Sequence, residues 1–268
     1  MLPPQVLIVA GSDSGGGAGI QADLKAVHAS GAYALTAITA VTAQNTVAVT
    51  RAFDLPADVV RAQIDAVFDD FDVAAVKTGM LSSVVLVETV ASALAARGVT
   101  RLVVDPVMIS KSGHALLADD AVEALRARVL PLAAVVTPNR LEAERLAGLA
   151  IRGRADVLEA GRRLLALGSR AAVIKGGHLE AAPGTDFLFH AGGVTEIEGE
   201  WIETRSTHGT GCTFASAIAA HLARGADLIA AVRAAKHLVT DAIRHGLALG
   251  HGYGPTDPFW RLGRSAGQ

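Results

Sequence analysis

The chain contains a single cysteine, Cys212, among its 268 residues. A disulfide within the chain is therefore excluded, and the cysteine content gives no sign of an oxidising compartment. Aromatic residues are also scarce, at 4%, although hydrophobic residues make up 51% of the sequence. Alanine, valine and leucine must then fill a sizeable core, and disorder of the whole chain is excluded.

An excess of charge and a long hydrophobic run are both missing. The formal net charge is −2, so no positive field attracts a nucleic-acid backbone or an anionic membrane surface. No window approaches the roughly 18 uninterrupted apolar residues of a membrane-spanning helix. The apolar run at residues 6–10 is too short for a signal peptide and has no basic segment before it. We therefore expect a cytoplasmic enzyme with no nucleic-acid or membrane partner.

Short β-branched runs alternate with longer helical patterns along most of the chain. The run at residues 5–10 is apolar throughout, which is typical of a parallel strand buried on both faces. Further strands are predicted at residues 35–41, 74–77, 102–104, 133–136 and 171–175, and a β-hairpin at 186–201 around Gly192-Gly193. Helices are predicted from the glycine-rich turn to Ser30, at 56–71, from a cap at Ser82 to Gly98, and at 120–130. Two more helices are predicted before residue 171, and the last two at 211–224 and 227–246. This alternation predicts one α/β domain over residues 1–268, with a mostly parallel sheet covered by helices on both faces.

Polar or small residues follow almost every predicted strand. Ligands of such sheets bind outside the carboxyl ends of the strands, so the chemistry is expected at one edge. The segments are Gly11-Ser12-Asp13, Thr42-Ala43-Gln44-Asn45, Thr78-Gly79-Met80, Asp105-Pro106, Thr137-Pro138-Asn139 and Gly176-Gly177-His178.

Two glycine-rich segments each lead into a predicted helix. The first, residues 11–19, permits close approach of the backbone to a ligand, but it lacks the lysine of a Walker A loop and does not fit dinucleotide spacing. It can equally be a tight turn that packs helix on strand. The second, residues 207–213, places amides at a helix start, where they can bind a migrating phosphoryl group. Cys212 lies in the first turn of that helix, where the dipole favours a thiolate, although a small buried hydrophobe is the plainer interpretation.

Several lone polar residues supply what phosphoryl transfer requires. Lys175 offers a cation for phosphates, and Asp105 and the pair Asn139 and Glu142 offer oxygen ligands for Mg²⁺. Each residue alone more often caps a helix or forms a surface ion pair, so the hypothesis depends on their joint placement. The amide of Gln44 matches the edge of an aminopyrimidine, but it can also satisfy backbone groups.

A few other polar and sulfur-containing residues have plainer interpretations. Asp23 can be a charge on a helix face, and His208 is interpreted as a turn residue. The nine histidines show no metal-ligand spacing, which argues against a zinc site. Met80 and Met108 are expected in the core or in a pocket wall.

Blocks along most of the chain resemble the hydroxymethylpyrimidine/phosphomethylpyrimidine kinases of the ribokinase-like superfamily, in the order of that family. They are residues 10–25, Thr42-Ala43-Gln44-Asn45-Thr46, Lys77-Thr78-Gly79-Met80-Leu81, Asp105-Pro106-Val107-Met108 with Lys111-Ser112-Gly113, Thr137-Pro138-Asn139 with Glu142-Ala143, Lys175-Gly176-Gly177-His178, and His208-Gly209-Thr210-Gly211-Cys212-Thr213. The resemblance implies a ribokinase-like three-layer sandwich and two successive ATP-dependent phosphorylations of a pyrimidine precursor of thiamine. It also implies Mg²⁺ and a homodimer.

The resemblance also implies roles for particular residues. Those around the pyrimidine are Gln44, Val41, Thr42, Asp23, Met80, Gly11, Ala18 and Val107. Those at the phosphates are Gly209, Thr210 and Gly211 as an anion hole, Lys175 and Thr207 facing ATP, and Asp105, Asn139 and Glu142 holding Mg²⁺ directly or through water. Cys212 stands where most of the superfamily has an aspartate base, a departure typical of this family, which makes the thiol a candidate base. Thr78 stands where the family pattern leads us to expect isoleucine.

Three other functions remain open from the sequence. A pyridoxal or pyridoxine kinase of the same superfamily also phosphorylates a ring hydroxymethyl group, but Cys212 and Gln44 favour the pyrimidine. A sensor that binds without catalysis need not keep Lys175, Asp105 and Asn139. A sugar kinase would require the aspartate base that this sequence lacks.

Overall fold

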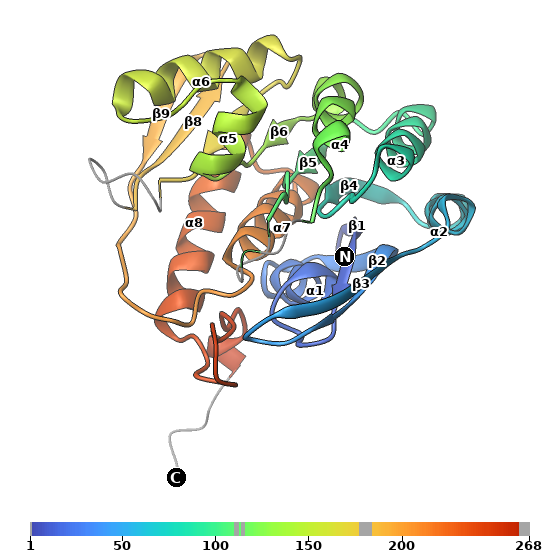
Figure 1. The fold of residues 1–268 in the computed structure, drawn as a ribbon, viewed down its shortest axis with the longest axis horizontal. Coiled ribbons are helices and arrows are strands. Elements are labelled where there is room, and N and C mark those ends of the chain that lie inside the picture. Colours follow the sequence, from blue (N-terminus) through green and yellow to red (C-terminus); the bar gives the residue numbers. More distant parts are fainter. Residues whose placement is uncertain (1, 110–112, 114–115, 177–183, 263–268) are drawn as a thin grey trace.

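The computed structural model describes residues 2–109, 113, 116–176 and 184–262. Within these residues, nine strands form one sheet in the order β3-β2-β1-β4-β5-β6-β7-β8-β9 (Figure 1). The strands are β1 (Gln5–Asp13), β2 (Tyr33–Gln44), β3 (Val49–Asp54), β4 (Val73–Thr78), β5 (Leu102–Val104), β6 (Val135–Val136), β7 (Ala172–Ile174), β8 (Asp186–His190) and β9 (Gly193–Ile197). The pairs from β2 to β7 are parallel, and the pairs that β3, β8 and β9 make are antiparallel.

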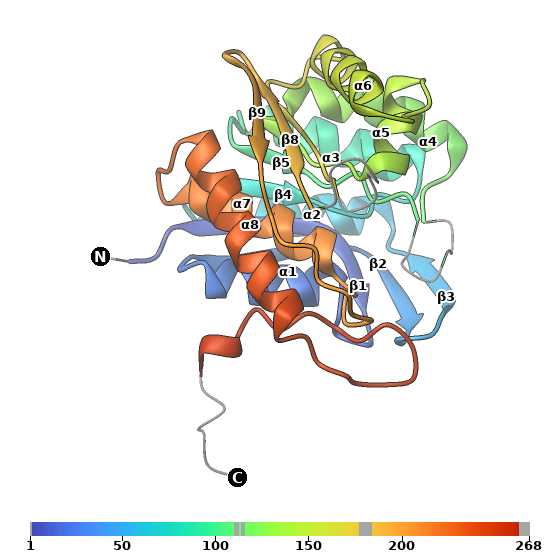
Figure 2. The ribbon, with the colours of Figure 1, turned by 90° about the vertical axis from the view of Figure 1, so that its left-hand side faces the viewer.

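Helices cover both faces of the sheet, as Figures 1 and 2 show. On one face lie α1 (Gly19–Ala29), α7 (Thr210–Ala223) and α8 (Leu228–Arg244), and on the other α2 (Ala57–Asp70), α3 (Val84–Ala96), α4 (Asp119–Ala124), α5 (Arg140–Ala147) and α6 (Arg154–Ala166). Strand residues alternate between the two layers, so Leu7 and Val9 join one core and Val6 and Ile8 the other. The predicted three-layer α/β sandwich is confirmed.

The structure differs from the prediction at the β2 edge of the sheet. Strand β3 was not predicted, because five of its six residues are exposed and give no apolar pattern. Its antiparallel pairing with β2 reaches Gln44, which pairs with Val49. Gln44 is therefore the last residue of a strand rather than part of a loop, and its position is fixed by the ladder.

Two helix predictions also need correction. Ser83, not Ser82, caps α3, because its side chain accepts a hydrogen bond from the amide of Leu86. The helix predicted at 120–130 is α-helical only to Ala124, then continues as a π-helical turn (Leu125–Val129) and a 3₁₀ turn (Leu130–Leu132). Pro131 lies in that last turn and cannot donate a backbone hydrogen bond, which explains why the α-helix does not continue.

The β-hairpin between residues 186 and 201 is confirmed, with Gly193 at a φ of 115° where β9 begins. No helix within the described part of the chain is long and apolar enough to span a bilayer. Lys111, Ser112, Gly177 and His178, which belong to the motifs above, lie outside the described residues.

Candidate active site

The start of α7 lies beside the charged residues at the strand ends. Gly209 has a φ of 80°, and a Cβ on it would lie 1.8 Å from the carbonyl oxygen of Gly17, so only glycine fits. A Cβ on Gly211 would lie 3.4 Å from Nζ of Lys175 and 3.6 Å from Oδ2 of Asp105. The first amides of a helix have no acceptor within it. These amides, an ammonium and a carboxylate therefore share one small volume.

Lys175 contacts two carboxylates but is tightly paired with neither. Its Nζ lies 3.4 Å from Oδ1 of Asp105 and 4.0 Å from Oε2 of Glu142, and 17% of its side chain is exposed. Burial lowers the pKa of Lys175, but the negative charges of Asp105 and Glu142 raise it by more. The pKa of Lys175 is therefore above its usual value. The side chain is an ammonium that is free to contact an incoming anion.

Asn139 and Glu142 form the capping box of α5. Oδ1 of Asn139 accepts a hydrogen bond of 3.0 Å from the amide of Glu142, and Oε2 of Glu142 accepts one of 2.7 Å from the amide of Asn139. Burial, followed by the effect of Asp105, raises the pKa of Glu142 to about 7, although Lys175 opposes this shift. The side-chain oxygen of Asn139 is already used by the cap, which leaves Asp105 and Glu142 as the anionic oxygen donors.

This donor set fits a magnesium site of the kind found with nucleotides. Such sites use one or two carboxylates together with waters and substrate phosphates. Asp105 and Glu142 supply the carboxylates, and Lys175 lies between them. The described residues contain no cluster of three or more His, Cys, Asp or Glu side chains that could bind a metal on their own. The residues thus fit Mg²⁺ that arrives with phosphates, held in part through water.

Gln44 lies next to the start of α7, as a single ligand site requires. Nε2 of Gln44 is 3.4 Å from Nε2 of His208, and His208 directly precedes Gly209. The hydroxyl of Thr42 lies 3.1 Å from Oε1 of Gln44 and 2.9 Å from the carbonyl oxygen of Ser12, so its one proton is shared between these two acceptors. Residues that are 164 positions apart are therefore neighbours, and the amide of Gln44 lies beside the helix start.

Asp13 and His208 contact each other at this end of the site, and sequence reasoning did not predict that pairing. Asp13 accepts hydrogen bonds from the amides of Gly15, Gly17 and Ala18, at 2.8 to 3.0 Å, and lies 3.0 Å from Nε2 of His208. Burial raises the pKa of Asp13, but these hydrogen bonds bring it below its usual value.

Because a carboxylate only accepts, Nε2 of His208 must carry a proton and donate it to Asp13. The amide group of Gln44 cannot donate to that same nitrogen, so it remains available to a ligand. The aspartate two residues before a glycine was the usable signal, since such an aspartate commonly accepts from its own turn.

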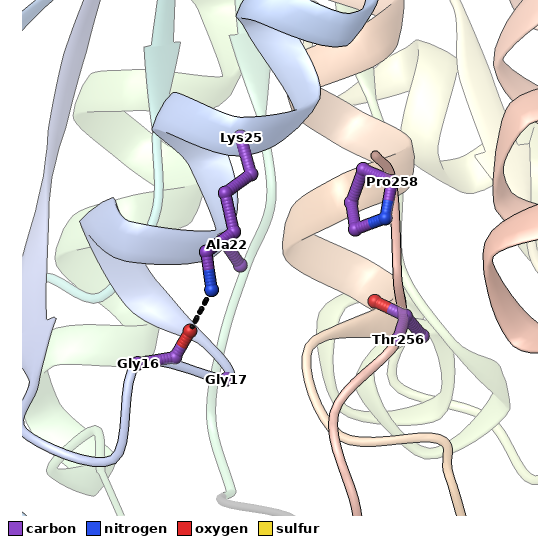
Figure 3. Close-up of a pocket in the computed structure, with 6 residues that line it drawn as sticks. All are labelled: Gly16, Gly17, Ala22, Lys25, Thr256 and Pro258. Carbon is purple, nitrogen blue, oxygen red and sulfur yellow. Dashed lines mark hydrogen bonds between the residues drawn. The ribbon is translucent and has the colours of Figure 1, made fainter. Parts of the chain in front are cut away.

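Two of the predicted wall residues, Gly11 and Met80, lie against each other. A Cβ on Gly11 would lie 3.1 Å from the sulfur of Met80. Met80 also lines a cavity of about 270 Å³, together with Ala52, Asp54, Ser82 and residues 116–118. Val41 is 48% exposed and Val107 is half-buried. A second hollow, between the start of α1 and residues 256–258, is too tight for a water molecule, and Lys25 donates to Gly16 there (Figure 3).

Asp23 has a different partner from the one predicted. It is completely buried, and its carboxylate binds Nζ of Lys77 at 2.8 and 2.9 Å and the hydroxyl of Ser216 at 2.7 Å. Direct contact between Asp23 and a substrate does not fit this geometry, because no part of the side chain faces solvent. The pairing of Asp23 with Lys77 was not predicted, because Lys77 lies within a short, mostly apolar strand, one residue before the end of β4.

The surroundings of Cys212 favour a neutral thiol over a thiolate. Burial raises the pKa of Cys212 to about 12; Lys77 lowers it, while Asp23 and Asp105 raise it. The amide of Gly19 also lowers this pKa by hydrogen bonding to the sulfur. Desolvation and nearby carboxylates therefore outweigh the helix start, and the side chain is a partly exposed thiol.

The segment from 246 to 257 connects both ends of the site. The amide of Tyr253 donates to the carbonyl of Thr46 at 2.9 Å, and that of Gly252 donates to the hydroxyl of Thr46 at 3.1 Å. On the other side, His208 donates its amide to the carbonyl of Gly254 at 2.9 Å. At the start of α7, the carbonyl of Thr207 accepts a hydrogen bond of 2.7 Å from the hydroxyl of Thr210. This segment thus fixes the spacing between the Gln44 strand and the helix start.

Known proteins resemble this chain over most of its length. The family model described as phosphomethylpyrimidine kinase matches residues 13–257. The chain is 52% identical to a hydroxymethylpyrimidine/phosphomethylpyrimidine kinase of Streptomyces coelicolor, over 97% of this chain and 96% of that protein. It is 48% identical to a thiamine biosynthesis bifunctional protein of Geobacter sulfurreducens, over 94% of this chain and 51% of that protein.

Among solved structures, an ADP complex of a Bacillus subtilis pyridoxal kinase superposes with a TM-score of 0.90 at 38% identity. The match covers 97% of this chain and all of that one. This chain has the nine-stranded sheet, the glycine-rich helix start and the polar strand-end residues described above. The family model also matches most of its length. The chain therefore belongs to the phosphomethylpyrimidine kinase family.

Proposed function

We propose that this protein transfers the γ-phosphate of ATP to the hydroxymethyl group of 4-amino-5-hydroxymethyl-2-methylpyrimidine. A second transfer to the monophosphate then gives the diphosphate used in thiamine biosynthesis. The contact between Gln44 and His208, which brings an amide edge beside the anion-binding helix start, carries this proposal. The name of the Streptomyces relative, with 52% identity over nearly both whole chains, supports it.

In this proposal the pyrimidine ring lies against Gln44. The amide of Gln44 is held by Thr42 and pairs with the ring edge, where it offers donor and acceptor together. The backbone of Val41 and Thr42 and the side chain of Met80 border the ring, with Gly11, Ala18 and Val107 completing the wall. Asp23 acts only from behind the site, through Lys77.

In this proposal the start of α7 and the residues around Lys175 neutralise the negative charge of the phosphates. The amides of Gly209, Thr210 and Gly211 donate hydrogen bonds to the oxygens of the migrating phosphoryl group. Such donors stabilise a loose transition state, whose charge lies on its equatorial oxygens. Lys175 and Thr207 face the phosphates of ATP. Asp105 and Glu142 hold Mg²⁺, in part through water, with Asn139 fixing Glu142. When bound, Mg²⁺ supplies positive charge that offsets the charge of the phosphate oxygens.

Cys212 takes the proton in this scheme. The hydroxymethyl oxygen forms a bond to the γ-phosphorus, and the bond to the ADP oxygen breaks with its electron pair. The Cys212 thiol first gives its own proton to solvent, and the resulting thiolate takes the hydroxyl proton and becomes a thiol again. Replacing Cys212 by alanine should lower kcat by ~10²–10⁴, the usual range for loss of a general base. Cys212→Ser keeps the volume and serves as control, with an intermediate rate. Turnover of Cys212→Ala near that of the wild type would exclude the role.

Pyridoxal is the second candidate substrate. The Bacillus subtilis pyridoxal kinase has a TM-score of 0.90 with this chain, which shows that the same architecture can hold a pyridine ring. We expect kcat/KM for hydroxymethylpyrimidine to exceed that for pyridoxal, because Gln44 offers an amide edge to an aminopyrimidine. Steady-state kinetics with both substrates at saturating Mg-ATP decide between them, and a preference for pyridoxal would overturn the proposal.

We further propose a cytoplasmic homodimer. Val41 and Phe53, which pair across β2 and β3, are 48% and 63% exposed, and this apolar face beside the site supports a subunit contact. Sedimentation velocity at micromolar concentration should give the mass of two chains, and Phe53→Glu should shift it toward one.

A further inference from the structure

A completely buried ion pair lies behind the thiol of Cys212. Nζ of Lys77 on β4 contacts both carboxylate oxygens of Asp23 on α1, at 2.8 and 2.9 Å, and neither side chain is exposed. Ser216 on α7 donates its hydroxyl to the same carboxylate at 2.7 Å. Removing two charges from water costs several kcal/mol per ion, and apolar residues of similar size are often at least as stable. Stability alone is therefore a weak explanation for this pair.

The pair lies on the side of α7 that carries Cys212. Cys212 precedes Ser216 by four residues, so the two side chains lie on one face of the helix, one turn apart. The amide of Gly19, at the start of α1, is close enough to the Cys212 thiol to lower its pKa. A Cβ on Gly79 would lie 2.9 Å from Nζ of Lys77, which places the ammonium at the carboxyl edge of the sheet with the other site residues. The helices and the strand that hold the ion pair thus also surround the thiol.

We propose that Lys77 is a positioning residue for Cys212. Its buried ammonium, held in place by Asp23, supplies a fixed positive charge that stabilises the thiolate form of Cys212 relative to the thiol. The charged groups that act on Cys212 are Lys77 from β4, Asp23 from α1, Asp105 after β5 and Lys175 after β7. The catalytic consequence rests on the proposed role of Cys212 as proton acceptor. The effect on the thiol itself does not.

A single-cysteine chain allows a direct test, because every alkylation event reports on Cys212. The intact protein is treated with iodoacetamide, a neutral reagent, at several pH values below the pKa of the thiol. At each pH the rate is proportional to the thiolate fraction, so a shift of one pKa unit changes the rate about tenfold.

The two charges should act with opposite signs. Lys77→Met removes the ammonium and should slow alkylation about tenfold or more, whereas Asp23→Asn removes a carboxylate and should accelerate it by a similar factor. A purely structural role would change both rates in the same direction through loosened packing. Changes of the same sign, or no change in either variant, would overturn the proposal.

Two controls separate charge from packing and from folding. Ser216→Ala loses a hydrogen bond to Asp23 but keeps both charges, so its rate should stay within about threefold of the wild type. Lys77→Arg keeps the charge and should restore part of the rate lost in Lys77→Met. If Lys77→Met does not fold, Asp23→Asn decides alone: faster alkylation supports the proposal, and an equal or slower rate overturns it.

The kinetic prediction follows the chemical one. The pH profile of kcat should move in the same direction as the alkylation rate in each variant, while KM for ATP stays unchanged. Alkylation needs neither ATP nor pyrimidine, so a failure of the proposed function would leave the thiol measurement intact. An altered alkylation rate with an unaltered kcat profile would instead refute only the role of Cys212 in turnover.

Discussion

Two lysines at the carboxyl edge of the sheet have opposite environments. Lys77 is completely buried and contacts Asp23 at 2.8 Å, whereas Lys175 is 17% exposed and lies 3.4 and 4.0 Å from its nearest carboxylates. Each has a raised pKa and is an ammonium. For Lys77, burial lowers the pKa, but Asp23, Cys212 and Asp105 raise it more.

The difference separates two uses of a positive charge. Lys77 is completely buried and bonded to both carboxylate oxygens of Asp23, so it cannot turn toward a ligand. Lys175 has loosely placed anions beside it and the start of α7 within reach, so a phosphate can improve its contacts. One lysine is therefore built into the fold, and the other is free to act on a substrate.

The largest effect should follow removal of the buried charge. Lys77→Met leaves Asp23 without its partner, so the free energy of unfolding should fall by about 3–5 kcal/mol, as measured by urea denaturation. Lys77→Met with Asp23→Leu removes both charges and should recover most of that loss. If the double variant is no more stable than the single one, charge pairing is not what holds this region.

The exposed lysine should show the reverse pattern. Lys175→Met should lower kcat by about 10²–10³, the range for one lost electrostatic contact to a transition state. Its free energy of unfolding should change by less than about 1 kcal/mol, because the ion pairs are long. Lys175→Arg keeps the charge and serves as control. A stability loss as large as that of Lys77→Met would erase the distinction between the two lysines.

A smaller effect concerns pH. The pKa of Glu142 beside Lys175 is raised from 4.5 to about 7, so the folded protein holds this proton more tightly than the unfolded chain does. Its contribution to stability is fully present below pH 4.5 and is lost as pH rises through about 7. Relative to Glu142→Gln, the wild type should lose on the order of 1–2 kcal/mol between about pH 5 and about pH 8, without divalent ions. Parallel curves for the two proteins would contradict the shift.

The smallest effect concerns the residue next to Lys77. Thr78 is completely buried, and among the described residues its hydroxyl has no hydrogen-bond partner. Thr78→Val should raise the free energy of unfolding by about 1 kcal/mol, because an unpaired buried hydroxyl is removed. Thr39→Val is the matched control. The Thr39 hydroxyl donates to the carbonyl of Met80 at 2.8 Å, so this change should destabilise by a similar amount. Equal signs for the two variants would contradict the assignment.

The sequence predicts the placement of single residues better than their pairing. The ends of parallel strands must share an edge, so the meeting of Asp105, Asn139 and Lys175 followed from the strand pattern alone. Contacts between distant residues did not follow from it. Asp13 meets His208 across 195 positions, and Asp23 meets Lys77 across 54, and no local pattern specifies which partner fills a buried position.

Two further features could not be predicted from the sequence, namely strand β3 and the surroundings of Cys212. Strand β3 carries exposed side chains on both faces, so it lacks the alternation that reveals a strand, yet its ladder fixes Gln44. The pKa of Cys212 depends on carboxylates contributed by α1 and by the end of β5, which the helix that carries it could not reveal. The glycine-rich start of α7, by contrast, was predictable, because a turn with a positive φ at Gly209 depends on local backbone geometry.

Product analysis by mass spectrometry tests the central claim most directly, that Gln44 and the start of α7 form one site for a hydroxymethylpyrimidine and a phosphate. The protein is incubated with 4-amino-5-hydroxymethyl-2-methylpyrimidine, ATP and Mg²⁺. We expect the mass of the pyrimidine to increase by one phosphate and then by a second, with ADP formed in equal amount. A pyrimidine of unchanged mass beside an active reaction with pyridoxal would contradict it.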